Sequence, residues 1–245
     1  MIVRVEAATR RRTMLDLVGL YVLSILSYVA TTKDVTPTLE SWIPGALAKA
    51  SPCVVLAVGV GWETARSKLV ALAFLLSAVG DFLLAHHDAS GKEASFLGGL
   101  VSFLIAQWVY TYCFSRGKER SDEEESGQGT LVSSALCYAY AGGLYSRLLT
   151  SIESGLEIPV LVYCISIATT LSSSVGVLLG AMKSVGKKVT AEAVLGVAGA
   201  ALFVVSDTCL ALQMFLGPVV PHPRLVIMST YFGAQLCLAI ALGDV

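Results

Sequence analysis

The sequence is poor in charge. Of its 245 residues, only 14% are Asp, Glu, Lys or Arg, whereas about 25% is usual for soluble domains. Hydrophobic residues make up 55%, and 22 glycines add to the apolar content. A chain of this size with so little polar surface would precipitate in water. The composition therefore excludes a soluble globular protein and indicates an integral membrane protein.

A basic surplus is also missing, because 17 Lys and Arg face 18 Asp and Glu and leave a net charge of -1. Nucleic-acid binding draws on such a surplus, so nucleic acid is excluded as a partner. Histidine is scarce too. Of the three histidines, His86 and His87 are adjacent and point apart on a helix, and the i, i+4 spacing of a zinc site is absent. We expect no metal and no cofactor.

The six cysteines give no disulfide framework, because all of them lie inside apolar runs and are expected to be small core residues. They are Cys53, Cys113, Cys137, Cys164, Cys209 and Cys237. The N-terminal arginines precede a long apolar segment with no small-residue cleavage site behind a short core. The first apolar segment is therefore expected to stay in the protein as an anchor.

Apolar runs recur along the whole chain. Crossing a hydrocarbon core of about 30 Å takes roughly 20 helical residues. The runs lie at about 14–32, 46–61, 67–86, 94–115, 130–149, 157–181, 189–216 and 223–243. The sequence predicts an all-α fold, a polytopic integral membrane protein with a bundle of about eight transmembrane helices. Residues 1–245 are expected to form a single transmembrane domain.

Positive charge separates the connecting segments into two sets, as expected when cytoplasmic loops hold Lys and Arg. With the N-terminus inside, the outer segments hold only Lys33, Lys92 and Arg224. The inner segments hold Arg4, Arg10, Arg11, Arg12, Arg66, Lys68, Arg116, Lys118, Arg120, Lys183, Lys187 and Lys188. This bias predicts that both termini are cytoplasmic. The charged stretch at about 115–130, rich in Ser and Gly, is expected to be a disordered loop.

Two carboxylates, Asp81 and Asp207, lie inside predicted spans, where an ionisable residue costs about 2.5–3.5 kcal/mol on insertion scales. Both helices run from inside to outside, and the acids lie roughly 21 Å and 27 Å along them. This similar depth favours one shared polar cavity, in which like-charge repulsion leaves one carboxyl protonated and the other ionised. The alternative is that each acid only hydrogen-bonds across a helix interface.

Other polar side chains at compatible depths are candidates for substrate binding. They are Lys49, Ser77, Gln107, Tyr110, Tyr231 and Gln235. Tyr231 and Gln235 are one turn apart and share a helix face. Lys49 either reaches the interface or pairs with an Asp, and Ser77 either bonds a backbone carbonyl or orients Asp81. The two tyrosines have packing as an alternative role.

At these residues the sequence resembles the lysoplasmalogenase family, the YhhN-like transmembrane proteins. The similar stretches are AKASP, SAVGDFLLAH, FLGGLVSFLIAQWVYTYCF, GAALFVVSDTCLALQMF and IMSTYFGAQLCLAIAL. The chain departs from the family pattern in two places. Gln107 stands where the family usually has a His, and two residues separate Lys49 from Pro52.

The resemblance implies an ether hydrolase that cleaves the vinyl ether bond of lysoplasmalogens to a fatty aldehyde and glycerophosphocholine or glycerophosphoethanolamine. It implies that Asp81 and Asp207 are the catalytic pair, that lysophospholipid and the lipid bilayer are the partners, and that the membrane is that of the endoplasmic reticulum. Intramembrane acids also relay protons, so a proton-coupled transporter or channel is the alternative, and a non-catalytic lipid-binding protein is a third. The sequence does not specify an oligomeric state.

Overall fold

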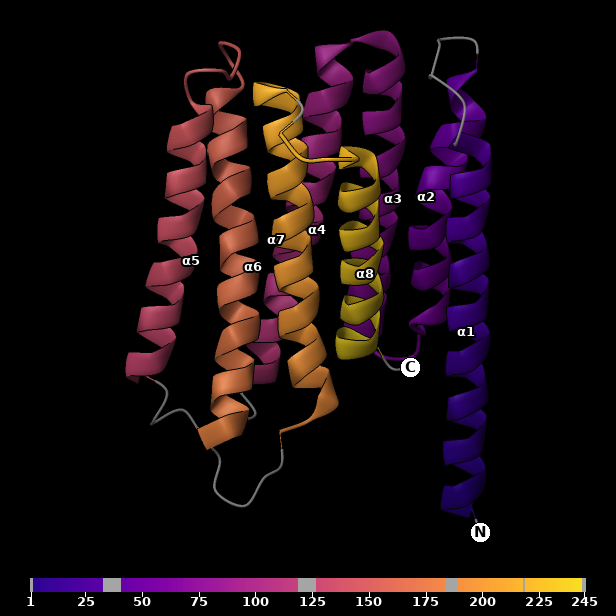
Figure 1. Ribbon diagram of the computed structural model, residues 1–245. Coiled ribbons are helices and arrows are strands. Elements are labelled where there is room, and N and C mark those ends of the chain that lie inside the picture. Colours follow the sequence, from indigo (N-terminus) through magenta and orange to yellow (C-terminus); the bar gives the residue numbers. More distant parts are fainter. Residues whose placement is uncertain (1, 33–40, 119–126, 184–188, 218, 244–245) are drawn as a thin grey trace. The chain divides into compact units, whose positions relative to one another are not determined.

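The computed structural model describes residues 2–32, 41–118, 127–183, 189–217 and 219–243, with the backbone alone for residues 2–14, 117, 118, 127 and 128. These residues form an all-α structure (Figure 1). The helices are α1 (Ile2–Thr32), α2 (Trp42–Gly59), α3 (Ala65–Ser90), α4 (Glu93–Lys118), α5 (Gly127–Leu148), α6 (Glu157–Lys183), α7 (Ala191–Leu216) and α8 (Pro223–Leu242). Seven of them are long and apolar enough to cross a membrane. The predicted all-α polytopic membrane protein is confirmed.

Helix α5 is not among those seven helices. Its 22 residues reach about 33 Å at 1.5 Å per residue, but Gly, Ser and Tyr residues and a terminal Arg lower its hydropathy. Hydroxyl pairs tie α5 to its neighbour α6, with Ser134 and Ser172 at 2.6 Å and Tyr138 and Thr169 at 3.0 Å. Inside a bilayer such hydroxyls need a protein partner, so these pairs hold a weakly apolar helix in place.

The loop predicted at about 115–130 is shorter at both ends than expected. Helix α4 continues to Lys118 and α5 already begins at Gly127. Helical hydrogen bonding therefore extends into the polar flanks that composition alone assigned to the loop. The remaining positions, 119–126, lie outside the described residues.

The chain forms two compact units, and the boundary falls inside α4 between Ala106 and Gln107. In the first unit, α2 packs against both α1 and α3 (Figure 1). The Ser102 hydroxyl of α4 donates to the Leu76 carbonyl of α3 at 2.7 Å, so the N-terminal part of α4 packs against α3. The single domain and the cytoplasmic termini expected from the sequence stay predictions.

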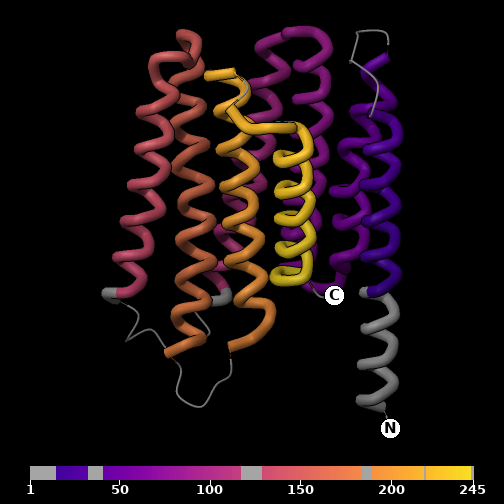
Figure 2. Tube along the Cα trace, viewed as in Figure 1, coloured from indigo at the N-terminus to yellow at the C-terminus, as the bar shows by residue number. Residues whose placement is uncertain are grey.

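In the second unit, α5, α6 and α7 follow one another as neighbours, and α8 runs beside α7 (Figure 2). The contact between α7 and α8 is close because α7 carries a glycine there. A Cβ built on Gly199 would lie 3.1 Å from the Ala234 carbonyl oxygen and 3.0 Å from Leu238 Cγ. Without a hydrophobic drive inside lipid, small residues of this kind let two helix backbones approach.

We therefore expect Gly199→Val to destabilise the protein by about 1–3 kcal/mol, the usual range for overpacking a tight interior. The matched control is Gly142→Val on α5, where an added Cβ would meet nothing within 4 Å. Thermal unfolding in detergent measures both variants. An equal loss of stability in the two variants would assign the effect to helix propensity rather than to the contact between α7 and α8.

Candidate active site

Asp81 lies on the buried face of α3. The helix begins with a capping box, in which the Thr64 side chain accepts from the Ser67 backbone N–H and the Ser67 side chain accepts from the Thr64 N–H. This box satisfies two amide groups that have no partner within the helix and fixes where α3 starts. Some four turns further on, Asp81 is 2% exposed. The local fold therefore sets a carboxyl group deep inside the first unit.

Lys49 and Cys53 of α2 meet this carboxyl group. Lys49 Nζ lies 3.9 Å from Asp81 Oδ1, and the Cys53 thiol donates to Oδ2 over 3.8 Å. The two residues are one turn apart and so share the face of α2 that packs on α3. Of the two roles predicted for Lys49, the structure shows the ion pair. A charged pair is the form in which a membrane interior tolerates a carboxylate.

The hydroxyl of Ser77, one turn before Asp81, donates to the Ala73 carbonyl of the same helix at 2.9 Å. That is the backbone role predicted as one of two for this residue. Gly80 lies directly before the acid, and a Cβ built there would come within 2.5 Å of the Phe103 ring of α4. A glycine at 80 therefore lets α4 pack against the turn that holds Asp81.

Asp207 lies on α7 in the second unit and is half-buried. The Tyr163 hydroxyl of α6 donates to Asp207 Oδ2 at 2.6 Å, a short O–H···O hydrogen bond. Ser206, directly before it, donates to the Ile227 carbonyl of α8 at 3.1 Å. The turn of α7 that carries Asp207 is therefore hydrogen-bonded to α6 and to α8.

The remaining predicted residues all lie in the second unit and are buried. The Tyr110 hydroxyl donates to Gln235 Oε1 at 3.0 Å, which joins α4 to α8. Tyr231 packs its ring against Phe203 of α7 at 5.6 Å, edge to face, so the packing role predicted for it is present. Gln107 accepts at its backbone carbonyl from the Thr170 hydroxyl at 3.1 Å.

The structure thus places Lys49 and Ser77 with Asp81 in the first unit, and the other predicted residues with Asp207 in the second unit. The sharing of one cavity by the two acids stays a prediction. Two contacts were not foreseen from the sequence, Cys53 beside Asp81 and Tyr163 beside Asp207. Cys53 stands four residues after Lys49, a spacing that signals a shared face, whereas no pattern in α6 marks Tyr163 from its apolar neighbours.

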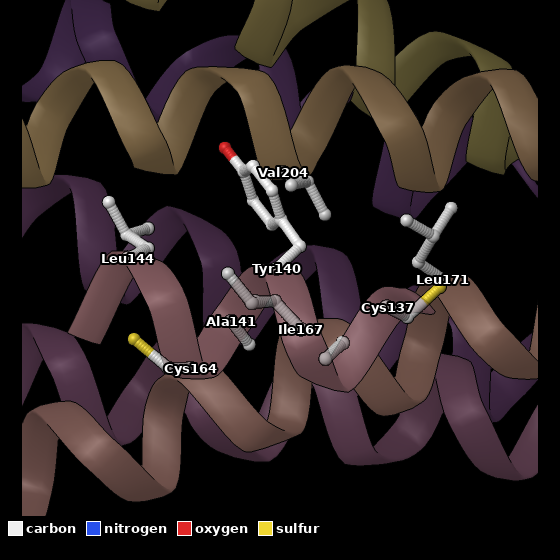
Figure 3. Close-up of a pocket in the computed structure, with 9 residues that line it drawn as sticks. Cys137, Tyr140, Ala141, Leu144, Cys164, Ile167, Leu171 and Val204 are labelled. Atoms are coloured by element: carbon white, nitrogen blue, oxygen red, sulfur yellow. The ribbon is translucent and has the colours of Figure 1, made fainter. Parts of the chain in front are cut away.

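A small pocket opens between α5, α6 and α7 (Figure 3). Its lining includes Cys137 and Tyr140 of α5, Cys164 of α6 and Val204 of α7, and neither acid belongs to it. The volume is about 10 Å³, roughly the room of one water molecule. Tyr140 directs its hydroxyl to Thr208 Oγ1 at 2.8 Å. This pocket is too small for a lipid chain.

Known proteins resemble this chain over most of its length. Lysoplasmalogenase TMEM86A of Bos taurus is 29% identical over 211 residues, which cover 82% of this chain and 78% of that protein. Lysoplasmalogenase TMEM86B of Sus scrofa is 31% identical over 209 residues, with 83% and 77% covered. Lysoplasmalogenase TMEM86B of Homo sapiens is 30% identical over 211 residues, with 82% and 79% covered. No solved structure matches.

The family resemblance seen in the sequence is confirmed at the level of the family itself. The stretch that matches the family model begins before Lys49 and continues to the end of α8, so it includes both acids and every candidate binding residue. Because the model of the YhhN family matches residues 45–242, the chain belongs to the YhhN family.

Proposed function

We propose that the protein is a membrane hydrolase that cleaves the vinyl ether bond of lysoplasmalogens, with Asp81 and Asp207 as the catalytic pair. The similarity to proteins named lysoplasmalogenase supports the substrate. The observation that carries the mechanism is the difference between the two acids. Asp81 has a cationic neighbour, Lys49, whereas Asp207 accepts from a neutral phenol, Tyr163.

That difference matches what vinyl ether cleavage needs. The bond breaks after protonation at carbon, which forms an oxocarbenium ion that water then captures, so the site must supply a proton donor and an anion. The division of labour resembles that of the two carboxyl groups in glycoside cleavage. In our proposal Asp207 is the acid, and Asp81, ion-paired with Lys49, is the anion that faces the cation.

The proton transfers of the proposed catalytic cycle balance. Asp207 gives its proton to the vinyl carbon distal to the ether oxygen. Water adds to the resulting cation and passes a proton to Asp81, which leaves a hemiacetal. Asp81 then returns that proton to the ether oxygen as the carbon–oxygen bond breaks, and Asp207 takes back the hemiacetal hydroxyl proton. The products are a fatty aldehyde and the glycerophospho alcohol, and both carboxyl groups recover their starting states.

Polar side chains on the other helices complete the proposed site. Tyr110, Tyr231 and Gln235 are proposed to bind the substrate from the second unit together with Gln107. Lys49 acts through Asp81 in the first unit, and Ser77 supports the α3 turn before it. By family analogy we also propose the endoplasmic reticulum as the membrane and glycerophosphocholine or glycerophosphoethanolamine as the released head group. No contact described above favours the transporter alternative.

The test uses purified protein in detergent, with no gradient, and three lysolipids of equal chain and head group. They differ at the sn-1 linkage, which is vinyl ether, alkyl ether or ester. We expect aldehyde from the vinyl ether substrate and no cleavage of the alkyl ether, because only the vinyl group can be protonated at carbon. Failure to release aldehyde, or faster release of fatty acid from the ester, would overturn the proposed function.

A further inference from the structure

Five buried hydrogen-bonding atoms of the second unit lack a partner among the described residues, and two of them, Thr130 Oγ1 and Gln213 Oε1, belong to residues that are partly exposed. The other three are Gln107 Nε2 on α4, Ser166 Oγ on α6 and Gln235 Nε2 on α8. The three residues are 1%, 2% and 0% exposed. Leaving a buried donor unpaired is costly, because the group gives up its hydrogen bonds to water and gains none in the protein. Three such atoms in one unit therefore indicate a ligand that supplies oxygen acceptors.

Hydrogen bonds connect the helices that carry these residues to one stretch of α4. The Thr170 hydroxyl lies 3.1 Å from the Gln107 carbonyl oxygen and 3.2 Å from the Ser166 carbonyl oxygen, so one side chain touches both backbones. Tyr110 stands one turn after Gln107 and donates to Gln235 Oε1 at 3.0 Å. That bond uses the amide oxygen of Gln235 and leaves its nitrogen as the donor. These bonds connect the stretches of α4, α6 and α8 that carry Gln107, Ser166 and Gln235, and we call these three residues the polar patch.

The chemistry of the patch selects a neutral oxygen. Amide N–H groups donate, and a serine hydroxyl both donates and accepts. A phosphate would need a cation, and the Lys and Arg side chains of the described part of this unit stand near helix ends. They are Arg116, Arg147, Lys183 and Arg224. A hydroxyl group or a water molecule needs no such charge.

We propose that Gln107, Ser166 and Gln235 form a binding site for a neutral oxygen, which is either the free glycerol hydroxyl of the lysolipid or a water molecule. The first source rests on the proposed function, whereas the second does not. If the hydroxyl binds here, the patch selects lysolipids against diacyl lipids, because an acylated oxygen has lost the proton that Ser166 accepts.

The sign of a stability change tests the site. Gln107→Met keeps the length of the side chain and removes the donor. If an oxygen ligand occupies the site, the melting temperature falls by about 2–4 °C, the shift that the loss of one hydrogen bond gives in a protein of this size. If the amide is simply unpaired, its removal raises the melting temperature. Gln213→Met near the end of α7 is the comparison variant, because the unpartnered atom that it removes is the acceptor Oε1 and lies outside the proposed site. Ser166→Ala repeats the test should Gln107→Met fail to fold.

Two uncleavable probes separate the sources: an alkyl-ether lysophosphocholine and its analogue without the glycerol hydroxyl. If the lipid hydroxyl is the ligand, the first probe raises the melting temperature of the wild type more, and Gln107→Met abolishes the difference. If water is the ligand, both probes act equally and Gln107→Met still lowers the melting temperature. An unchanged or raised melting temperature, with equal probe shifts in both proteins, overturns the site. Aldehyde assays on the same preparations report separately on the proposed function.

Discussion

Asp81→Asn is expected to lower aldehyde release by about 10²–10⁴-fold, the range that acid–base groups contribute. Asparagine has nearly the same shape, but it neither carries the negative charge that faces the oxocarbenium ion nor takes a proton from water. The assay is initial-rate aldehyde release from a vinyl ether lysolipid in detergent. Retention of near-wild-type turnover by Asp81→Asn would contradict its role as the anion.

The ion pair complicates that variant, because it leaves Lys49 Nζ without the carboxylate that lies 3.9 Å away. Losing one partner of a buried pair destabilises strongly, whereas replacing both by apolar or neutral groups is often neutral. The control is therefore the double variant Lys49→Met with Asp81→Asn. We expect it to recover thermal stability and to stay inactive. Recovery of activity in the double variant would show that the pair serves folding and not chemistry.

The helices could be predicted from the sequence because lipid imposes one simple rule. A spanning segment must be about 20 residues long and apolar, and it must satisfy its own backbone. Helix α3 follows that rule in full. Helix α5 is less apolar than the rule requires. Hydroxyl pairs with α6, such as Ser134 with Ser172, help to hold it in place. Pairs of this kind depend on which helix lies alongside, and composition does not encode that.

The two acids of the candidate site could also be predicted from the properties of lipid, but their partners could not. Charge inside lipid is costly, so Asp81 and Asp207 stand out from their neighbours without any knowledge of the fold. Their partners do not stand out. Tyr163 is an ordinary aromatic residue in an apolar span until α6 packs beside α7 and sets its hydroxyl 2.6 Å from Asp207. Such contacts depend on how each helix is rotated about its axis, and a single sequence gives little information on that rotation.

Asp207→Asn is expected to remove aldehyde release as completely as the change at Asp81, because asparagine has no proton to give to the vinyl carbon. Tyr163→Phe separates the carboxyl group from its positioning. Without the phenol, Oδ2 loses the bond that fixes the orientation of the acid, and we expect turnover to fall by about tenfold, the equivalent of one hydrogen bond, with KM nearly unchanged.

The chain offers a matched control for that step. Tyr140 of α5 makes the same kind of bond, from its phenol to the Thr208 hydroxyl at 2.8 Å, one residue beyond the acid. Tyr140→Phe is therefore expected to lower stability slightly and to leave turnover intact. An equal loss of turnover in both tyrosine variants would mean that α7 responds to any loosening, and it would leave Tyr163 without a specific role. A loss confined to Tyr163→Phe would tie the turnover to the one hydroxyl that bonds the acid.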